Sequence, residues 1–173
     1  KNRTDCDKVH IAINCKAMKV SYRLLDICQR LTREANVRPV FNFFPGEKGV
    51  ELAGFRSRIE SYLPDAQVYG YLAYPTFLQA LANCDLSLAA FPFGNTNSTV
   101  DALLLGIPVV AHYGPEIPAR TDHDIIDLLG LTDNMVCRSD QEYFETALQL
   151  INDSTQRRQL NHKIRRAKPD EAL

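Results

Sequence analysis

Hydrophobic positions along the chain follow two spacings that alternate. Short runs rich in β-branched and aromatic residues predict six strands, at residues 8–14, 37–44, 66–69, 86–90, 108–111 and 135–136. Apolar residues three and four positions apart predict seven helices, at residues 20–35, 50–63, 74–83, 98–105, 122–129, 140–151 and 154–166. Gly106 follows the fourth helix, where a left-handed residue would end it.

Strands and helices that alternate with short connections predict an α/β fold with a parallel sheet covered on both faces. The crossover rule and a count of about six strands favour a Rossmann-like, doubly wound sheet. No internal repeat, low-complexity linker or second domain pattern divides the 173 residues. We therefore expect one domain that spans residues 1–173.

Composition narrows the class of protein. A formal net charge of −1 provides no basic field to recruit nucleic acid or an anionic membrane surface. No apolar run approaches the roughly 20 residues of a membrane span, and no secretory leader precedes the first strand. The chain opens at Lys1 without a methionine. We therefore expect a piece of a longer, cytoplasmic protein.

The five cysteines are odd in number and scattered. A disulfide framework needs paired spacing, and a structural zinc site needs clustered ligands. We therefore expect reduced thiols in a cytosolic core, with only Cys6 exposed. The five are Cys6, Cys15, Cys28, Cys84 and Cys137.

The loop after the fourth strand carries the most unusual polar run. In a doubly wound sheet, ligands bind at the carboxyl ends of the strands. The first such loop lacks the G-x-G-x-x-G of dinucleotide enzymes, and the chain has no G-x-x-x-x-G-K-[ST] motif. Residues 94–99 instead place glycine and five polar residues (GNTNST) directly before an apolar helix.

Two interpretations fit this run equally well. Asn97 or Ser98 can cap the helix, and Ser98 with Asp101 matches a capping box. Alternatively, the free N–H groups and the dipole at the helix start form a site for a diphosphate. The residues alone leave both interpretations open.

Other polar groups offer weaker candidates. A lysine in the stretch 16–19 (KAMK) would face the same crevice and could neutralise a leaving diphosphate, although such a lysine is usually solvated. Asp122, His123 and Asp124 favour a charged helix start over a metal or acid–base cluster. His112 follows the fifth strand and is a weak candidate for the crevice. The cations that end the last helix favour a solvated helix terminus.

These segments resemble glycosyltransferase family 41, and most closely its bacterial soluble N-glycosyltransferases of high-molecular-weight adhesins. Their F-P-F-G-N-T-N run recurs at residues 91–97, followed by the matching Asp101, Gly106 and Pro108. The protein O-GlcNAc transferases belong to the same family. The resemblance extends from about residue 9 to residue 151 and includes shorter agreeing stretches: Met18-Lys19, Asn83-Cys84-Asp85, Gly114 with Glu116, and Leu129-Gly130-Leu131.

The resemblance implies the C-terminal, donor-binding lobe of an inverting GT-B enzyme that uses a UDP-sugar and needs no metal. Lys19 would stabilise the leaving UDP, and Asp101 would organise the ribose or the lysine. Thr96, Asn97 and Ser98 would contact phosphate oxygens, so the resemblance favours phosphate binding over capping for this polar run. Tyr74 and, more loosely, Tyr71 would line the uracil.

The chain departs from the adhesin enzymes at several positions. Ser98 stands where they usually have glycine, which tightens the approach of phosphate to the backbone. Glu47 follows Gly46 where a glutamine near the sugar is expected, so the identity of the sugar is open. Pro118 and Arg120 replace two histidines, and Arg120 becomes a candidate phosphate ligand, as an arginine is in the O-GlcNAc branch.

We therefore expect the UDP-sugar-binding domain of a protein glycosyltransferase that transfers glucose, or another hexose, to asparagine of an adhesin-type protein. The protein acceptor would bind through an N-terminal lobe that this chain lacks, so the isolated chain would be inactive. Two alternatives remain: O-linked GlcNAc transfer to Ser or Thr, and a non-catalytic nucleotide-sugar-binding domain.

Overall fold

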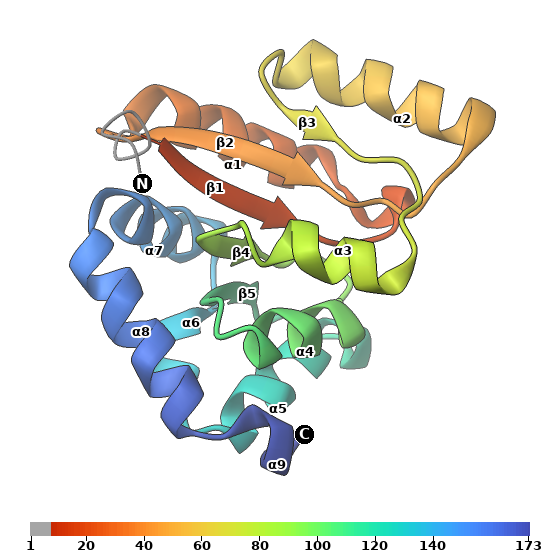
Figure 1. Ribbon diagram of the computed structural model, residues 1–173. Helices are drawn as coiled ribbons and strands as arrows, with labels where there is room; N and C mark the ends of the chain where they lie inside the picture. Colours follow the sequence, from red (N-terminus) through yellow and green to blue (C-terminus); the bar gives the residue numbers. More distant parts are fainter. Residues whose placement is uncertain (1–7) are drawn as a thin grey trace.

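The computed structural model describes residues 8–173 of the chain (Figure 1). Within this range, parallel strands form one sheet in the order β3-β2-β1-β4-β5-β6. The order reverses between β1 and β4, as it does in doubly wound folds, so the expected fold is confirmed. The strands are β1 (Lys8–Ile13), β2 (Arg38–Phe43), β3 (Gln67–Val68), β4 (Leu86–Leu88), β5 (Val109–His112) and β6 (Val136–Cys137).

Helices bury apolar side chains against both faces of the sheet. In β1, Ile11 and Ile13 join one core and Ala12 joins the other, because successive strand residues point to opposite faces. Helices α1, α2 and α7 pack on the first face, and α3, α4 and α5 on the second. The long helices are α1 (Tyr22–Glu34), α2 (Gly49–Tyr62), α3 (Tyr74–Leu81), α4 (Asn97–Leu104), α5 (Thr121–Leu128), α7 (Asp140–Asn152) and α8 (Ser154–Arg166).

Within residues 8–173, four single-turn helices were not expected from the sequence. A helix of three or four residues is too short to show a repeated apolar spacing. One of them shortens α1, which begins at Tyr22 after the N-cap Ser21, whose Oγ accepts from the Leu24 N–H at 3.2 Å. The four are η2 (Ala17–Lys19), η3 (Ile117–Ala119), α6 (Thr132–Met135) and α9 (Pro169–Ala172).

Helix α8 runs along one side of the molecule from α7 to the C-terminal end (Figure 1). The cationic side chains of α8 were expected to be solvated, but two of them donate to backbone carbonyls instead. The Arg165 guanidinium donates to the Leu105 carbonyl at 3.0 Å, and Arg157 donates to the Leu150 and Ile151 carbonyls. These carbonyls belong to the last turns of α4 and α7, where no intrahelical N–H remains to pair with them.

The end of α4 is as expected. Gly106 has φ 75°, and its N–H donates to the Leu103 carbonyl at 2.9 Å. The Ile107 N–H donates to the Ala102 carbonyl at 2.8 Å, which completes a Schellman motif. The left-handed residue therefore ends the helix and turns the chain into β5.

The cysteines among the described residues are buried free thiols, which confirms the expectation of a reduced core. Burial raises the pKa of Cys15 and of Cys84 to about 12. Cys6 lies outside the described residues. Between residues 8 and 173, no helix combines the length and the apolar character that a membrane crossing requires.

Candidate functional site

A cavity of about 370 Å³ opens at the carboxyl edge of the sheet, beyond the ends of β1 and β2. It adjoins the switch point between β1 and β4, where doubly wound folds bind their ligands. The residues around it that the sequence did not single out include Asn14, Cys15, Phe44, Leu72 and Phe77. Six of the ten expected site residues line it: Gly46, Tyr71, Tyr74, Asn97, Ser98 and Asp101.

The start of α4 faces this cavity. Its N-cap is Thr96, whose side chain makes no capping hydrogen bond, so the capping interpretation for Asn97 or Ser98 is wrong. The Ser98 N–H donates to the Asn95 carbonyl at 3.1 Å. Among residues 8–173, the N–H groups of Asn97 and Thr99 have no hydrogen-bond partner, and Asn97 lines the cavity. The helix start therefore keeps an open donor beside the cavity, as an anion site requires.

Thr96 holds an unusual backbone conformation, with φ 41° and ψ −91°. Positive φ is rare for a β-branched residue and costs on the order of 1–3 kcal/mol. The surrounding structure must therefore hold the loop in place.

A buried carboxylate, Asp122, supplies that restraint. The residue is only 3% exposed, and its carboxylate oxygens accept from the Asn95 N–H at 2.9 Å, the Thr96 N–H at 2.9 Å and the Thr99 hydroxyl at 2.8 Å. Burial raises the pKa of Asp122, while these hydrogen bonds and the nearby Lys19 charge lower it.

Asp122 and Asp124 lie in the first turn of α5, which confirms the expected charged helix start, but the sequence did not identify the inward-facing role of Asp122. Asp122 lies four residues before Ile126, which is also buried, so both point inward from α5. That spacing was the available signal. A cluster of three or more His, Cys, Asp or Glu side chains that could hold a metal ion does not occur in the part of the chain from Lys8 to Leu173.

Glycine is required at position 94 because the loop passes close to the backbone before α5. The Gly94 N–H donates to the Pro118 carbonyl oxygen at 2.7 Å. A Cβ at this position would lie 2.6 Å from the same oxygen and would also collide with the Thr121 hydroxyl. The loop after β4 and the loop before α5 therefore touch, backbone to backbone.

Lys19 lies at the other side of the loop, in η2. Its ammonium donates to the Gly94 carbonyl at 2.6 Å. The structure thus brings Lys19 to the loop that precedes α4, on the same edge of the sheet as Asn97. Lys19 and Thr96 share a neighbouring cavity of about 410 Å³ with Met18, Phe93, Gly94, Pro118 and Thr121.

Aromatic side chains form the opposite wall of the first cavity. The Tyr74 hydroxyl donates to the Asp101 carboxylate at 2.7 Å, and this bond raises the pKa of Tyr74. The Lys48 ammonium lies 3.9 Å from the centre of the Tyr71 ring. Phe77, one turn after Tyr74 in α3, adds an apolar face that the sequence analysis missed.

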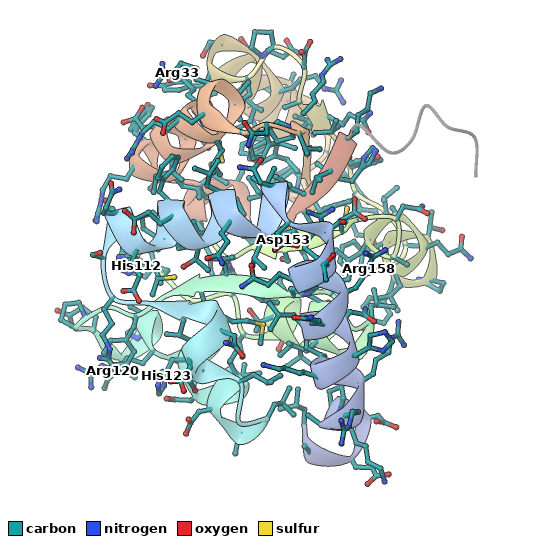
Figure 2. The ribbon with its side chains drawn as sticks, turned by 90° about the vertical axis from the view of Figure 1, so that its left-hand side faces the viewer. Arg33, His112, Arg120, His123, Asp153 and Arg158 are labelled. Atoms are coloured by element: carbon teal, nitrogen blue, oxygen red, sulfur yellow. The ribbon has the colours of Figure 1, made fainter. Side chains whose placement is uncertain are left out.

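The last two expected residues lie apart from the cavity lining. The Glu47 carbonyl accepts from the Tyr71 N–H at 2.9 Å, so Glu47 positions the aromatic wall through its backbone. The Arg120 guanidinium donates to the carbonyls of Gly114 and Pro115 in its own loop. Figure 2 shows Arg120 at the edge of the molecule beside His123.

Comparison with known proteins now identifies the relationship. No family model matches the chain. Over 164 residues, 94% of this chain, it is 30% identical to the UDP-glucose:protein N-beta-glucosyltransferase of Actinobacillus pleuropneumoniae serotype 5b (strain L20). Over 88 residues, 51% of this chain and 9% of the relative, it is 33% identical to the probable UDP-N-acetylglucosamine--peptide N-acetylglucosaminyltransferase SPINDLY of Solanum lycopersicum.

The chain is related to glycosyltransferase family 41. The resemblance seen in the sequence is thereby confirmed, and its relatives are glycosyltransferases. The chain spans about a quarter, 26%, of the length of the N-glucosyltransferase that it matches.

Solved structures support the same fold. A mutant O-GlcNAc transferase of Thermobaculum terrenum superimposes with a TM-score of 0.79 at 18% identity, covering 94% of this chain and 32% of its own. WaaG, a glycosyltransferase involved in lipopolysaccharide biosynthesis, superimposes with a TM-score of 0.66 at 12% identity. The match covers 96% of this chain and 46% of the WaaG chain. The six-stranded α/β domain therefore has the fold of a lobe of GT-B glycosyltransferases, as expected.

Proposed function

We propose that this domain binds the UDP-sugar donor of an inverting, metal-independent protein glycosyltransferase. The diphosphate would bind at the start of α4, and the uridine would extend along the aromatic wall of the cavity. The observation that supports this most strongly is the convergence of Asn97 and Ser98 with Asp101, Tyr71 and Tyr74 around one cavity. A volume of about 370 Å³ falls within the range of small-molecule sites.

The reaction needs a group that stabilises the negative charge that develops on the diphosphate as UDP leaves. In an inverting transfer, the acceptor nitrogen gives up one proton and bonds to the anomeric carbon from one face, while the bond to the phosphate oxygen breaks on the other. The electron pair of that bond stays on the diphosphate. Helix N–H groups and a lysine near the leaving oxygen stabilise this charge, and they stand where other enzymes use a metal ion.

We assign the expected residues to this reaction as follows. Lys19 would act on the leaving diphosphate, and Thr96 shares its cavity. Asn97 and Ser98 would donate to phosphate oxygens. Asp101, held by Tyr74, would accept from the ribose hydroxyls. Phe77 would contact the uracil ring.

We infer the sugar and the acceptor of the reaction from the relatives. The N-glucosyltransferase matches 94% of this chain, whereas the SPINDLY proteins match about half of it. This favours glucose, or another hexose, as the sugar and asparagine of an adhesin-type protein as the acceptor, which would bind outside this chain in a cytoplasmic setting. O-linked GlcNAc transfer is the second candidate. Preference for UDP-glucose over UDP-GlcNAc in a titration of this domain would separate the two donors.

Isothermal titration calorimetry with UDP tests the proposal. We expect saturable binding without added divalent cation, and no loss of affinity in excess EDTA. A correctly folded domain, as judged by circular dichroism, that shows no binding at millimolar UDP would refute it.

A pair of charge variants sharpens the test. Asn97→Asp adds a negative charge where the phosphate would bind and should abolish UDP binding. Asn36→Asp makes the same change at an exposed position by the amino end of β2, at the opposite edge of the sheet. It should bind UDP like the wild type. Equal losses in both variants would argue against a phosphate at α4.

A further inference from the structure

Two lysines flank the start of α4, and the structure gives them different surroundings. Lys16 and Lys19 lie three residues apart in the loop after β1; Lys16 precedes the single turn η2, and Lys19 ends it. Lys16 lines the cavity that contains Asn97, Ser98 and Asp101. Lys19 lines the neighbouring cavity that contains Gly94 and Thr96. The turn therefore places the two ammonium groups on different sides of the loop.

The charge of Lys19 is already engaged by the protein. Its ammonium donates to the Gly94 carbonyl at 2.6 Å. It also lies close enough to the buried Asp122 carboxylate to lower the pKa of that group. Asp122 holds the N–H groups of Asn95 and Thr96. Lys19, Gly94 and Asp122 thus form one assembly that fixes the loop before α4 and balances its charge.

Lys16 has no such compensation. Within the described residues, no carboxylate lies at ion-pair distance from its ammonium. Its Nζ comes within 3.2 Å of the point where a Cβ at position 46 would stand. Gly46 has φ 69°, a conformation that favours glycine, and the missing side chain leaves room for the lysine. The lysine and the first turn of α4 therefore face the same space.

We propose that Lys16 is a second cation, beside Lys19, and that it pairs with the donor diphosphate inside the cavity, while Lys19 also holds the loop and the charge of Asp122. The inference rests on the proposed function, because it assigns a contact to the same ligand. An anion in the cavity meets the start of α4, with the open Asn97 N–H, on one side and the Lys16 ammonium on the other. Lys16 then decides how strongly the site prefers a diphosphate to a neutral nucleoside.

The test compares Lys16→Gln with the wild-type chain, using UDP and uridine as ligands in NMR titrations, which also report weak binding. Losing a hydrogen bond to a charged group should lower the affinity for UDP about tenfold or more. The affinity for uridine should not change, because uridine carries no phosphate. The salt dependence of UDP binding should weaken in the variant.

Two further variants complete the design. Lys8→Gln removes a lysine at the exposed amino end of β1, on the opposite edge of the sheet, and should bind UDP like the wild type. Lys19→Gln should lose less UDP affinity than Lys16→Gln. Circular dichroism spectra and thermal unfolding of each variant confirm that it is folded.

Each contrary result has its own meaning. If Lys16→Gln binds UDP like the wild type, Lys16 is not the phosphate partner, although the proposed function stands. If it weakens UDP and uridine equally, it acts on the shape of the cavity, and the charge pairing is wrong. If the wild-type chain binds no UDP, the proposed function and this inference both fall.

Discussion

Replacing Asp122 by alanine should destabilise the chain strongly and locally. The substitution removes the acceptor of three donors: the N–H groups of Asn95 and Thr96 and the hydroxyl of Thr99. A buried donor left without a partner costs about 1–3 kcal/mol. A hydroxyl can reorient more readily than a backbone amide, so the two amides carry most of the loss. Relief from burying a charge offsets part of it, and we expect a net loss of about 2–4 kcal/mol in the free energy of unfolding.

Urea denaturation followed by circular dichroism measures this loss, since the chain has no tryptophan to report by fluorescence. The matched control is Thr99→Val, which removes one donor and keeps the side-chain shape. It should cost about 1 kcal/mol. If Asp122→Ala costs no more than Thr99→Val, the carboxylate does not hold the loop, and other contacts must keep Thr96 at positive φ.

Three further predictions concern the same region and the core. Gly94→Ala should destabilise the chain by about 1–3 kcal/mol in urea denaturation, because the new Cβ would meet the Pro118 carbonyl. The control is Gly54→Ala, at a helix position where a Cβ would have nothing within 4 Å. This change should stabilise the chain by about 0.5–1 kcal/mol. The raised pKa of Asp122 means that the native state holds its proton more tightly than the unfolded state. The free energy of unfolding of the wild type, relative to Asp122→Asn, should therefore fall as pH rises from about 4 through that raised pKa. An opposite slope would contradict the direction of the shift. Finally, burial raises the pKa of Cys28, so peptide mapping after brief iodoacetamide treatment of the native chain at pH 8 should find it unlabelled.

The fold was accessible from the sequence because its signals are local. Alternating strands and helices indicate a parallel sheet, and Gly106 marks the end of α4 within one turn. The position of the ligand edge also follows from the fold class, so the polar run before α4 could be placed beside the loop after β1. These inferences need only spacing and chain order.

The details of the site depend on contacts between distant residues. Asp122 reaches a loop more than 20 positions earlier, and nothing in its neighbours His123 and Asp124 indicates that it points inward. The separate directions of Lys16 and Lys19 arise from η2, a single turn with no periodic signal. The residues alone also left a capped helix start open, whereas tertiary contacts place the uncapped Thr96 there.

The construction of this loop bears on its purpose. An N-cap side chain that accepts from the first N–H groups would satisfy the start of α4 with local hydrogen bonds and little strain. The chain instead buries the Asp122 carboxylate, whose pKa burial raises, and holds Thr96 at positive φ. Both features work against stability, and both fall in the segment that presents Asn97 and Ser98 to the cavity. Strain that the surrounding structure maintains is characteristic of functional sites. Because the carboxylate occupies the N–H groups before the helix, an external anion can meet only the donors inside the cavity. Under the proposed function, the buried carboxylate therefore directs the donor diphosphate to the donors inside the cavity.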